Sequence, residues 1–397
     1  MAFLYPFSKK GLQNILVLPV LFSLLLSCKK KEPGNTGNIE ITTKHEIASV
    51  CTELFMTAKQ DGQGRNYLYV AAKEGGLKIY DINIAPLLKK TILLSQLGSL
   101  EVMNLSQSGN FLFLALGNHF GTAQQNPGMA IIDVTDPVNA SVKSVWKDLT
   151  RISGAGIVET DGNYAYLGAM KSGMMIFDIS DKSSPVLKSV FVPSILYPDP
   201  NPDPAKFNAR GIAIRNDLVY LCYDAGGLRI INVADKQNPV ETGKYANPEM
   251  NGKPRAYNNI VLDGSVAYIT VDYCGMETLD ISNPSDIRLL SWWNPWNCQT
   301  NPLNWFSSNG HSNEIALDKI NKLVFMSTGK SDMQVVNVAN PGNPVHKYEY
   351  GGVDNNIGTW GVSVFNDNIY LSYLCNPLPW PFPSSWTGIK MLKYEVK

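Results

Sequence analysis

The sequence has no excess of charge of either sign. Its 34 Lys and Arg balance its 34 Asp and Glu, so the formal net charge at pH 7 is zero. A chain without a basic surplus has little electrostatic attraction for nucleic acid, and no long run of like charge marks an interaction tail. We therefore expect no nucleic-acid partner.

Signatures of catalysis and metal binding are equally scarce. No Gly-x-Ser-x-Gly segment supports a hydrolase with a catalytic triad. Gly329-Lys330-Ser331 has the tail of a phosphate loop, but Val324 stands where that motif needs Gly. Asp199 and Asp203 alternate with Pro in YPDPNPDP, which favours a stiff loop over a Ca²⁺ site. We expect neither a metal nor a cofactor, because no HExxH motif and no pair four residues apart occurs among the four histidines, His45, His119, His311 and His346.

Long stretches of helical periodicity are also missing. Gly, Pro and Tyr are plentiful, with 32, 24 and 18 residues. Short alternating segments separated by turn residues are typical of strands. The sequence therefore predicts an all-β protein.

The first residues have the pattern of an export signal. Lys9 and Lys10 precede an apolar run at residues 15–26, which Ser27 and Cys28 follow. A bilayer span needs about 20 apolar residues, so this run is too short for a transmembrane helix. It favours a cleaved secretory signal.

Leu25-Leu26-Ser27-Cys28 resembles a bacterial lipoprotein lipobox. The resemblance implies that Cys28 becomes an acylated N-terminus, and Lys29 in place of Asp implies delivery to the outer membrane. Several acyl chains would anchor the protein firmly, since each buried CH₂ contributes roughly 0.8 kcal/mol. We expect a lipoprotein signal peptide at 1–28, a flexible tether at 29–38 and a single domain at 39–397, lying on the periplasmic face or the cell surface.

A repeat runs through the rest of the chain. An aromatic residue in one strand is followed twelve positions later by the Asp or Asn that ends the next strand. Two further copies fit after an insertion, Phe113 with Asp133 and Tyr370 with Lys393. The uninterrupted copies are Tyr69 with Asp81, Tyr166 with Asp178, Tyr220 with Asn232, Tyr268 with Asp280, and Phe325 with Asn337.

Each of these seven units reads as four short strands. In the third, the strands are expected at 156–159, 164–169, 173–179 and 186–192, with a hairpin turn at Asp161-Gly162. Such a unit cannot bury both faces alone, whereas stacking units around an axis does so. The sequence predicts a seven-bladed β-propeller of four-stranded antiparallel blades.

The seventh unit ends before its fourth strand. The segment at 39–49, IEITTKHEIAS, precedes the first unit and has strand character. We expect it to complete the last blade, because such an exchange ties the termini together and removes an exposed edge.

The third strands carry a recurring signature: GGLKIYDI at Gly75, SGMMIFDI at Ser172 and GGLRIINV at Gly226, each followed by a Pro-containing turn. These segments resemble the LVIVD-repeat family of bacterial surface propellers. Asn232 is one of three residues that replace the family's Asp, and the last unit is degenerate. The resemblance implies a propeller on a secreted or membrane-anchored protein, with no defined chemistry.

The long insertions are expected on one side of the ring. They lie at 117–128 and 375–388, between second and third strands, and at 193–209 and 294–310, between units. Long loops on a rigid scaffold often hold binding residues. Their aromatic side chains either bind a glycan or partner or pack to make the loops compact. The Trp candidates for binding are Trp293, Trp296, Trp305, Trp380 and Trp386.

The mouth of the central channel on that side is a second candidate site. Alignment of the innermost strands places Arg210, Asn258, Asn313 and Trp360 at equivalent positions, with His311 just before Asn313. Polar residues that converge at a concave mouth are typical of a ligand site. A channel lined by solvated polar groups is the simpler interpretation.

Five cysteines follow Cys28, and export permits disulfides. Cys274 and Cys298 belong to one unit and are expected on one face, so they are the candidate disulfide, with Cys375 as a competing partner. Cys51 and Cys222 lie in strand patterns and are expected to be small buried apolar residues.

The favoured functional hypothesis is a monomeric, lipid-anchored binding or scaffolding propeller without catalytic activity, whose ligand is a glycan or another envelope protein. The alternative is an envelope hydrolase or lyase at the channel mouth. Glu101, Arg210 and His311 would then serve as acid, base or charge stabiliser.

Overall fold

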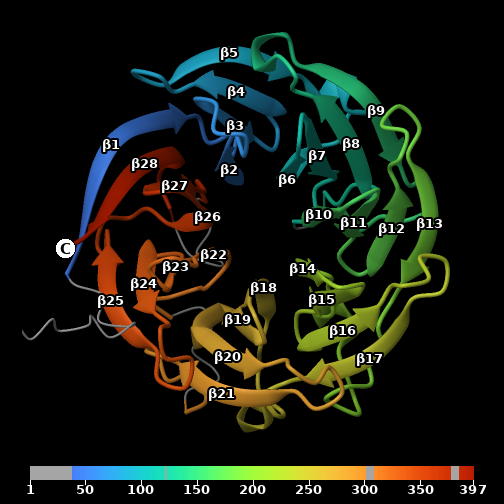
Figure 1. The fold of residues 1–397 in the computed structure, drawn as a ribbon, viewed down its shortest axis with the longest axis vertical. Coiled ribbons are helices and arrows are strands. Elements are labelled where there is room, and N and C mark those ends of the chain that lie inside the picture. Colours follow the sequence, from blue (N-terminus) through green and yellow to red (C-terminus); the bar gives the residue numbers. More distant parts are fainter. Residues whose placement is uncertain (1–37, 121–122, 301–307, 377–383) are drawn as a thin grey trace, which may run out of the picture. The chain divides into compact units, whose positions relative to one another are not determined.

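The computed structural model describes residues 38–120, 123–300, 308–376 and 384–397. These described residues form one compact unit. Within it, seven four-stranded antiparallel sheets stand around a central axis as the blades of a propeller (Figure 1). The predicted fold class is therefore confirmed.

Blades 1 to 4 follow the chain, each from its innermost to its outermost strand. Blade 1 contains β2 (Thr57–Gln60), β3 (Tyr67–Ala71), β4 (Leu77–Asp81) and β5 (Leu87–Ile92). Blade 2 contains β6 (Val102–Ser108), β7 (Phe111–Leu116), β8 (Gly128–Asp133) and β9 (Ser141–Lys147). Blade 3 contains β10 (Ile157–Asp161), β11 (Tyr164–Gly168), β12 (Met174–Asp178) and β13 (Val186–Phe191). Blade 4 contains β14 (Gly211–Arg215), β15 (Leu218–Cys222), β16 (Leu228–Asn232) and β17 (Val240–Tyr245).

Blades 5 to 7 continue the same order until the last strand. Blade 5 contains β18 (Tyr257–Asp263), β19 (Val266–Val271), β20 (Met276–Asp280) and β21 (Arg288–Trp293). Blade 6 contains β22 (Ile315–Asp318), β23 (Leu323–Ser327), β24 (Met333–Asn337) and β25 (Val345–Tyr350). Blade 7 contains β26 (Thr359–Phe365), β27 (Asn368–Tyr373), β28 (Thr387–Val396) and, as its outermost strand, β1 (Ile39–Ser49).

The ring closes through β1, as the sequence predicted. This strand pairs antiparallel with β28, from Ile39 opposite Val396 to Ser49 opposite Thr387. The backbone N–H of Lys397 also donates to the carbonyl of Asn38 at 2.9 Å. The first and last strands of the domain are thus neighbours in one sheet (Figure 1).

The Asp or Asn that ends the third strand of blades 1 to 6 starts the following turn. The side-chain oxygen of Asp178 accepts a hydrogen bond from the backbone N–H of Ser180 at 3.0 Å, and Asn232 does the same for Ala234 at 2.9 Å. This geometry starts the turn into the fourth strand. Because Asn offers the same acceptor as Asp, the Asn copies of the repeat fold alike.

Glycine before the third strand is required by close backbone contact. Gly227 has φ of 77°, and a Cβ atom there would lie 2.1 Å from the carbonyl oxygen of Tyr245. Gly76 has the same arrangement against the carbonyl of Ile92. A side chain at either position would push the fourth strand away from the third.

The core consists of layers between blades. The buried side chains of the described residues form seven clusters, each lying between two neighbouring blades. Phe113 and Phe177, for example, share the layer between blades 2 and 3. A blade therefore buries its two faces against its two neighbours, and no blade has a core of its own.

Helical structure in the described ranges is limited to five 3₁₀ turns. No helix in those ranges has the length and hydropathy needed to cross a membrane. The turns are η1 (Leu94–Gln96), η2 (Pro137–Asn139), η3 (Pro204–Lys206), η4 (Pro248–Met250) and η5 (Asp272–Cys274).

Candidate functional site

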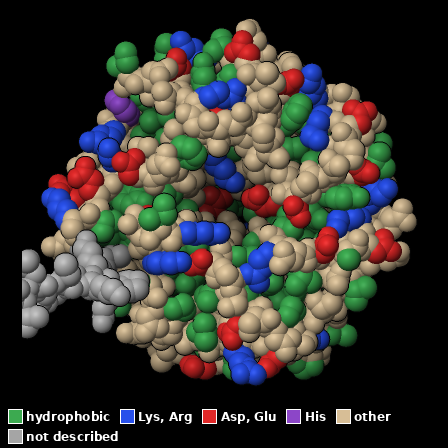
Figure 2. Space-filling view, in the orientation of Figure 1, with side chains coloured by type: hydrophobic (Ala, Val, Ile, Leu, Met, Phe, Trp, Pro, Cys, Tyr) green, Lys and Arg blue, Asp and Glu red, His purple; other side chains and the backbone are tan. Residues whose placement is uncertain are grey.

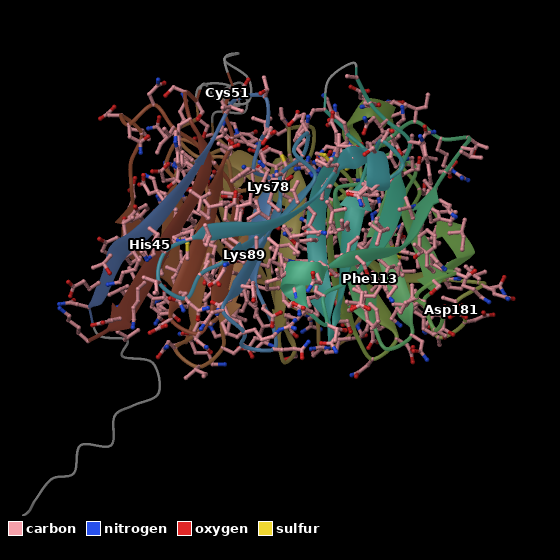
Figure 3. All side chains as sticks on the ribbon, turned by 90° about the horizontal axis from the view of Figure 1, so that it is seen from above. His45, Cys51, Lys78, Lys89, Phe113 and Asp181 are labelled. Atoms are coloured by element: carbon pink, nitrogen blue, oxygen red, sulfur yellow. A yellow bond between two sulfur atoms is a disulfide. The ribbon has the colours of Figure 1, made fainter. Side chains whose placement is uncertain are left out.

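The two sides of the ring differ in the length of their loops. We call the side with the connections between second and third strands and between blades the loop face, and the opposite side the turn face. The described residues of the four long insertions all belong to the loop face; they are 117–120, 123–127, 192–210, 294–300, 308–314, 374–376 and 384–386. In Figure 3, Cys51 lies at the loop-face edge and Asp181 toward the turn face. Figure 2 shows the turn face, where acidic and basic side chains surround the central opening.

Two disulfides join segments of the loop face. Cys274 in η5 is bonded to Cys298, which ties the insertion after blade 5 to its own blade. Cys51 is bonded to Cys375, 324 residues away in sequence. The prediction that Cys51 is a small buried apolar residue was wrong: it is exposed, because β1 ends at Ser49 and Cys51 already lies in the loop toward β2. Cys222 is buried and free, as expected.

The described tryptophans of the insertions are packed against the protein. Trp293 lies edge-on to Trp296, with ring centroids 5.9 Å apart, and stacks on His346. A Cβ atom on Gly310 would lie 1.8 Å from the Trp296 ring, so the indole covers the backbone there. Trp386 lies edge-on to Tyr373. These contacts make the loops compact, while Trp305 and Trp380 lie outside the described residues.

Two buried arginines hold the Pro-rich insertion after blade 3. Arg229 donates to the carbonyls of Ser194 and Tyr197, each at 3.0 Å. Arg255 donates to the carboxylate of Asp199 at 2.5 Å. The Asp203 side chain instead accepts from the backbone N–H of Ala205 and begins η3. No group of three metal-ligating side chains occurs among the described residues.

The channel mouth contains the polar cluster suggested by strand alignment. Arg210, Asn258, Asn313 and Trp360 line one cavity of about 30 Å³. The cavity has room for water or for the polar end of a larger ligand. His119, which sequence reasoning did not select, also lines it.

Arg210 is the positive group of this cavity. Its guanidinium lies over the Trp360 ring, 5.8 Å from the centroid, and Trp360 is held edge-on by Phe120 at 5.1 Å. The backbone N–H of Arg210 donates to the carbonyl of Cys222 at 2.9 Å, but its guanidinium makes no hydrogen bond or ion pair with the described residues. The half-buried arginine is therefore oriented by an aromatic ring and keeps its hydrogen-bonding capacity.

His119 and Asn258 have further unused polar atoms. Both ring nitrogens of His119 are buried without a hydrogen bond of normal geometry to the described residues, although the backbone of Ala155 lies near. Burial, assisted by the charge of Arg210, lowers the pKa of His119 to about 3, so the ring is neutral at pH 7. Asn258 donates through Nδ2 to the carbonyl of Ser312 at 2.8 Å, but its Oδ1 is buried without a donor from the described part of the chain.

Glu101 and His311 do not line this cavity with Arg210. Glu101 forms an ion pair with Lys73 at 2.7 Å. His311 is buried, and its Nδ1 lies 2.6 Å from Oδ1 of Asp272. Two of the three residues named for an enzymatic alternative therefore have their own charged partners.

An acidic side chain, Glu314, also lines this cavity. Oε1 of Glu314 accepts from Nδ2 of Asn104 at 3.0 Å, and Thr57 donates to Oε2 at 3.4 Å. Burial raises the pKa of Glu314 to about 7, and burial also raises that of Glu159, whose Oε1 lies 3.8 Å from Nζ of Lys59. Glu314 is therefore engaged by an amide and a hydroxyl group, and Glu159 by the ammonium group of Lys59.

Comparison with known families identifies the repeat. The LVIVD repeat model matches residues 65–85, 155–192, 208–247 and 254–293. The chain contains LVIVD repeats. The matches fall on blades 1, 3, 4 and 5, in which no insertion separates the second strand from the third. No curated protein matches the chain.

Solved structures share the propeller at low sequence identity. The β-propeller domain of Myceliophteria thermophila Cps50 (Swd1) aligns with a TM-score of 0.59 and 13% identity, covering 89% of this chain and 99% of that one. A chain of a mitotic checkpoint complex aligns with a TM-score of 0.59 and 8% identity, over 96% and 99%. Saccharomyces cerevisiae Sqt1 aligns with a TM-score of 0.56 and 10% identity, covering 85% of this chain and 83% of that one. These likenesses establish the fold alone, an architecture consistent with a binding or scaffolding module.

Proposed function

We propose that this LVIVD-repeat propeller is an outer-membrane lipoprotein that binds a glycan or another envelope protein through its loop face. The observation that carries the proposal is the channel mouth, where Arg210, His119 and Asn258 keep polar atoms that the described residues do not satisfy. Buried polar groups in a folded protein are normally hydrogen-bonded. Unused groups gathered at one concave site favour recognition of an external molecule.

Covalent bonds and buried side chains hold several loops of the loop face. Both disulfides and the two buried arginines fix loops that belong to it. Fixed loops lose less conformational entropy when they bind, so they support tighter recognition. The enzymatic alternative has no comparable support, because Glu101 and His311 are engaged elsewhere.

The proposed location rests on the N-terminal motif and on the cysteines. Cys28 lies in the lipobox-like segment, outside the described residues. Disulfides persist in oxidising compartments such as the periplasm and the cell surface, and four of the remaining cysteines are paired. The pairing supports an exported protein.

The proposal is tested with the full-length protein in detergent, applied to a glycan array and used to capture envelope proteins. Two matched variants locate the surface: Ile152→Cys on the loop face and Ile320→Cys on the turn face, which replace side chains that are 57% and 91% exposed. Each is coupled to a polyethylene glycol maleimide. We expect the polymer at residue 152 to suppress binding and the polymer at residue 320 to leave it intact. Equal effects, or no captured glycan or envelope protein, would contradict the proposal.

A further inference from the structure

The charge around Arg210 limits which ligand the channel mouth accepts. Lys73, whose charge also acts on His119, is engaged by Glu101 and Glu74. The buried Asp224 adds a carboxylate whose pKa burial raises to about 6 against the opposing effect of Arg210. Glu314, which lines the same cavity, has a pKa of about 7 and is already engaged by Asn104 and Thr57. These two carboxyl groups offset part of the Arg210 charge, so Arg210 can pair with at most one negative charge and a dianion is disfavoured.

The free donors and acceptors of the channel mouth also limit the chemical class of the ligand. A guanidinium presents parallel N–H groups that match the two oxygens of a carboxylate. The Asn258 Oδ1 accepts only, and neutral His119 offers one donor and one acceptor. A ligand that satisfies all three therefore carries a carboxylate with a hydroxyl group beside it.

The size of the cavity sets how much of that ligand enters. About 30 Å³ is room for a carboxylate and an adjacent hydroxyl, while the rest of the molecule stays above the mouth. The Trp360 ring beneath Arg210 keeps the guanidinium in place, because the cation–π contact restrains an otherwise flexible side chain. The site is thus suited to the acidic end of a larger molecule.

We propose that the channel mouth binds the carboxylate of an acidic sugar, with Arg210 on the two carboxylate oxygens and Asn258 Oδ1 accepting from a neighbouring hydroxyl. The proposal rests on the proposed glycan-binding function of the loop face and names its ligand class. A neutral sugar lacks the group that pairs with Arg210, and inorganic phosphate lacks the hydroxyl-bearing ring carbon beside the anion.

The test is a titration of the full-length protein in detergent with D-glucuronate, D-glucose and inorganic phosphate, followed by calorimetry and by the imidazole NMR signals of the four histidines. The matched variants are Arg210→Gln at the channel mouth and Arg215→Gln at the other end of β14, where the guanidinium donates to Tyr220 Oη at 3.2 Å. Thermal melting confirms that each variant is folded.

We expect glucuronate to bind the native protein and to shift the His119 signal. Arg210→Gln should weaken this binding roughly 10- to 100-fold, the usual effect of losing charged hydrogen bonds, and Arg215→Gln should leave it unchanged. Equal binding by the native protein and Arg210→Gln, or equal affinity for glucose or phosphate, overturns the proposal.

The two proposals fail separately. If a neutral glycan or an envelope protein binds the loop face and glucuronate does not bind, the carboxylate site is wrong and the proposed function stands. If glucuronate binds through Arg210 while the array and the capture yield nothing, the mouth is a site for a small free acid and the proposed function falls.

Discussion

Glu314 is a residue whose charge opposes folding. Its pKa is raised from 4.5 to about 7 by burial, so the folded protein holds a proton that the unfolded chain releases above pH 4.5. The destabilisation that Glu314 causes is absent below pH 4.5. It grows between pH 4.5 and about 7 and is fully present above that range. A shift of this size corresponds to about 3 kcal/mol at most.

We predict that Glu314→Gln makes the protein more stable at pH 8 and flattens the loss of stability between pH 4.5 and 7. The amide keeps an acceptor for Asn104 and has no proton to lose. Urea unfolding followed across this pH range measures the effect. The exposed Glu395→Gln is the control and should leave the pH profile as it is. Parallel profiles for the native protein and Glu314→Gln would contradict the assignment.

The side chain of Trp296 allows a second prediction for a single residue. Its ring covers Gly310 and meets Trp293, so Trp296→Ala removes packing from the insertion after blade 5. We expect a loss of about 2 kcal/mol in the free energy of unfolding, less than for a fully buried Trp because the side chain is half-buried. Chemical denaturation measures it, with Ile84→Ala, at an 88% exposed position, as a near-neutral control. An unchanged midpoint for Trp296→Ala would show that the contact contributes nothing.

The cross-linked loops allow a prediction at the scale of elements. In the chain-entropy description a disulfide stabilises more when it closes a longer loop, by about 3 kcal/mol for a short loop and about 5 kcal/mol for one of hundreds of residues. The double variant Cys51→Ser/Cys375→Ser should therefore lower the melting temperature more than Cys274→Ser/Cys298→Ser, since the sequence separations are 324 and 24. Calorimetry without reductant compares them. The reverse order would mean that native-state contacts outweigh loop closure.

Strand order was predictable because it is encoded locally and repeatedly. The twelve-residue interval corresponds to the length of one hairpin. Because the last unit lacks a fourth strand of its own, the segment that forms β1 was the remaining strand able to complete it. The Cys51–Cys375 bond was not predictable, because nothing local distinguishes a loop cysteine after β1 from one inside a strand.

The candidate site was predictable only in part. Alignment of innermost strands brought Arg210, Asn258, Asn313 and Trp360 together because these strands are equivalent by the repeat. His119 was missed because the insertion of blade 2 breaks that equivalence. The pairing of His311 with Asp272 was also missed, since it joins two loops of different blades and depends on their packing.

For the whole molecule, we predict that acylation of Cys28 anchors the protein to a membrane. If Cys28 is acylated, Cys28→Ser should move the protein from the membrane fraction to the soluble fraction and abolish labelling with a palmitate analogue, because the acyl chains supply the membrane affinity. Cell fractionation measures the first effect and in-gel fluorescence the second. Cys222→Ser is the control and should stay membrane-bound, since that cysteine is buried in the fold. Membrane retention of Cys28→Ser would point to another anchor.

If the protein is anchored through Cys28 and holds a ligand on its loop face, the closing strand determines how it would carry tension. β1 enters the ring at Ile39 on the turn face and leaves it at Ser49 on the loop face (Figure 3). A pull on the anchor would then be applied at Ile39, while the ligand would resist it at the other end of the strand. Force in this direction shears the whole β1–β28 ladder at once, instead of opening its hydrogen bonds one after another. The Cys51–Cys375 bond fastens the far end of the same strand, so such a load would meet a covalent link before the propeller could open.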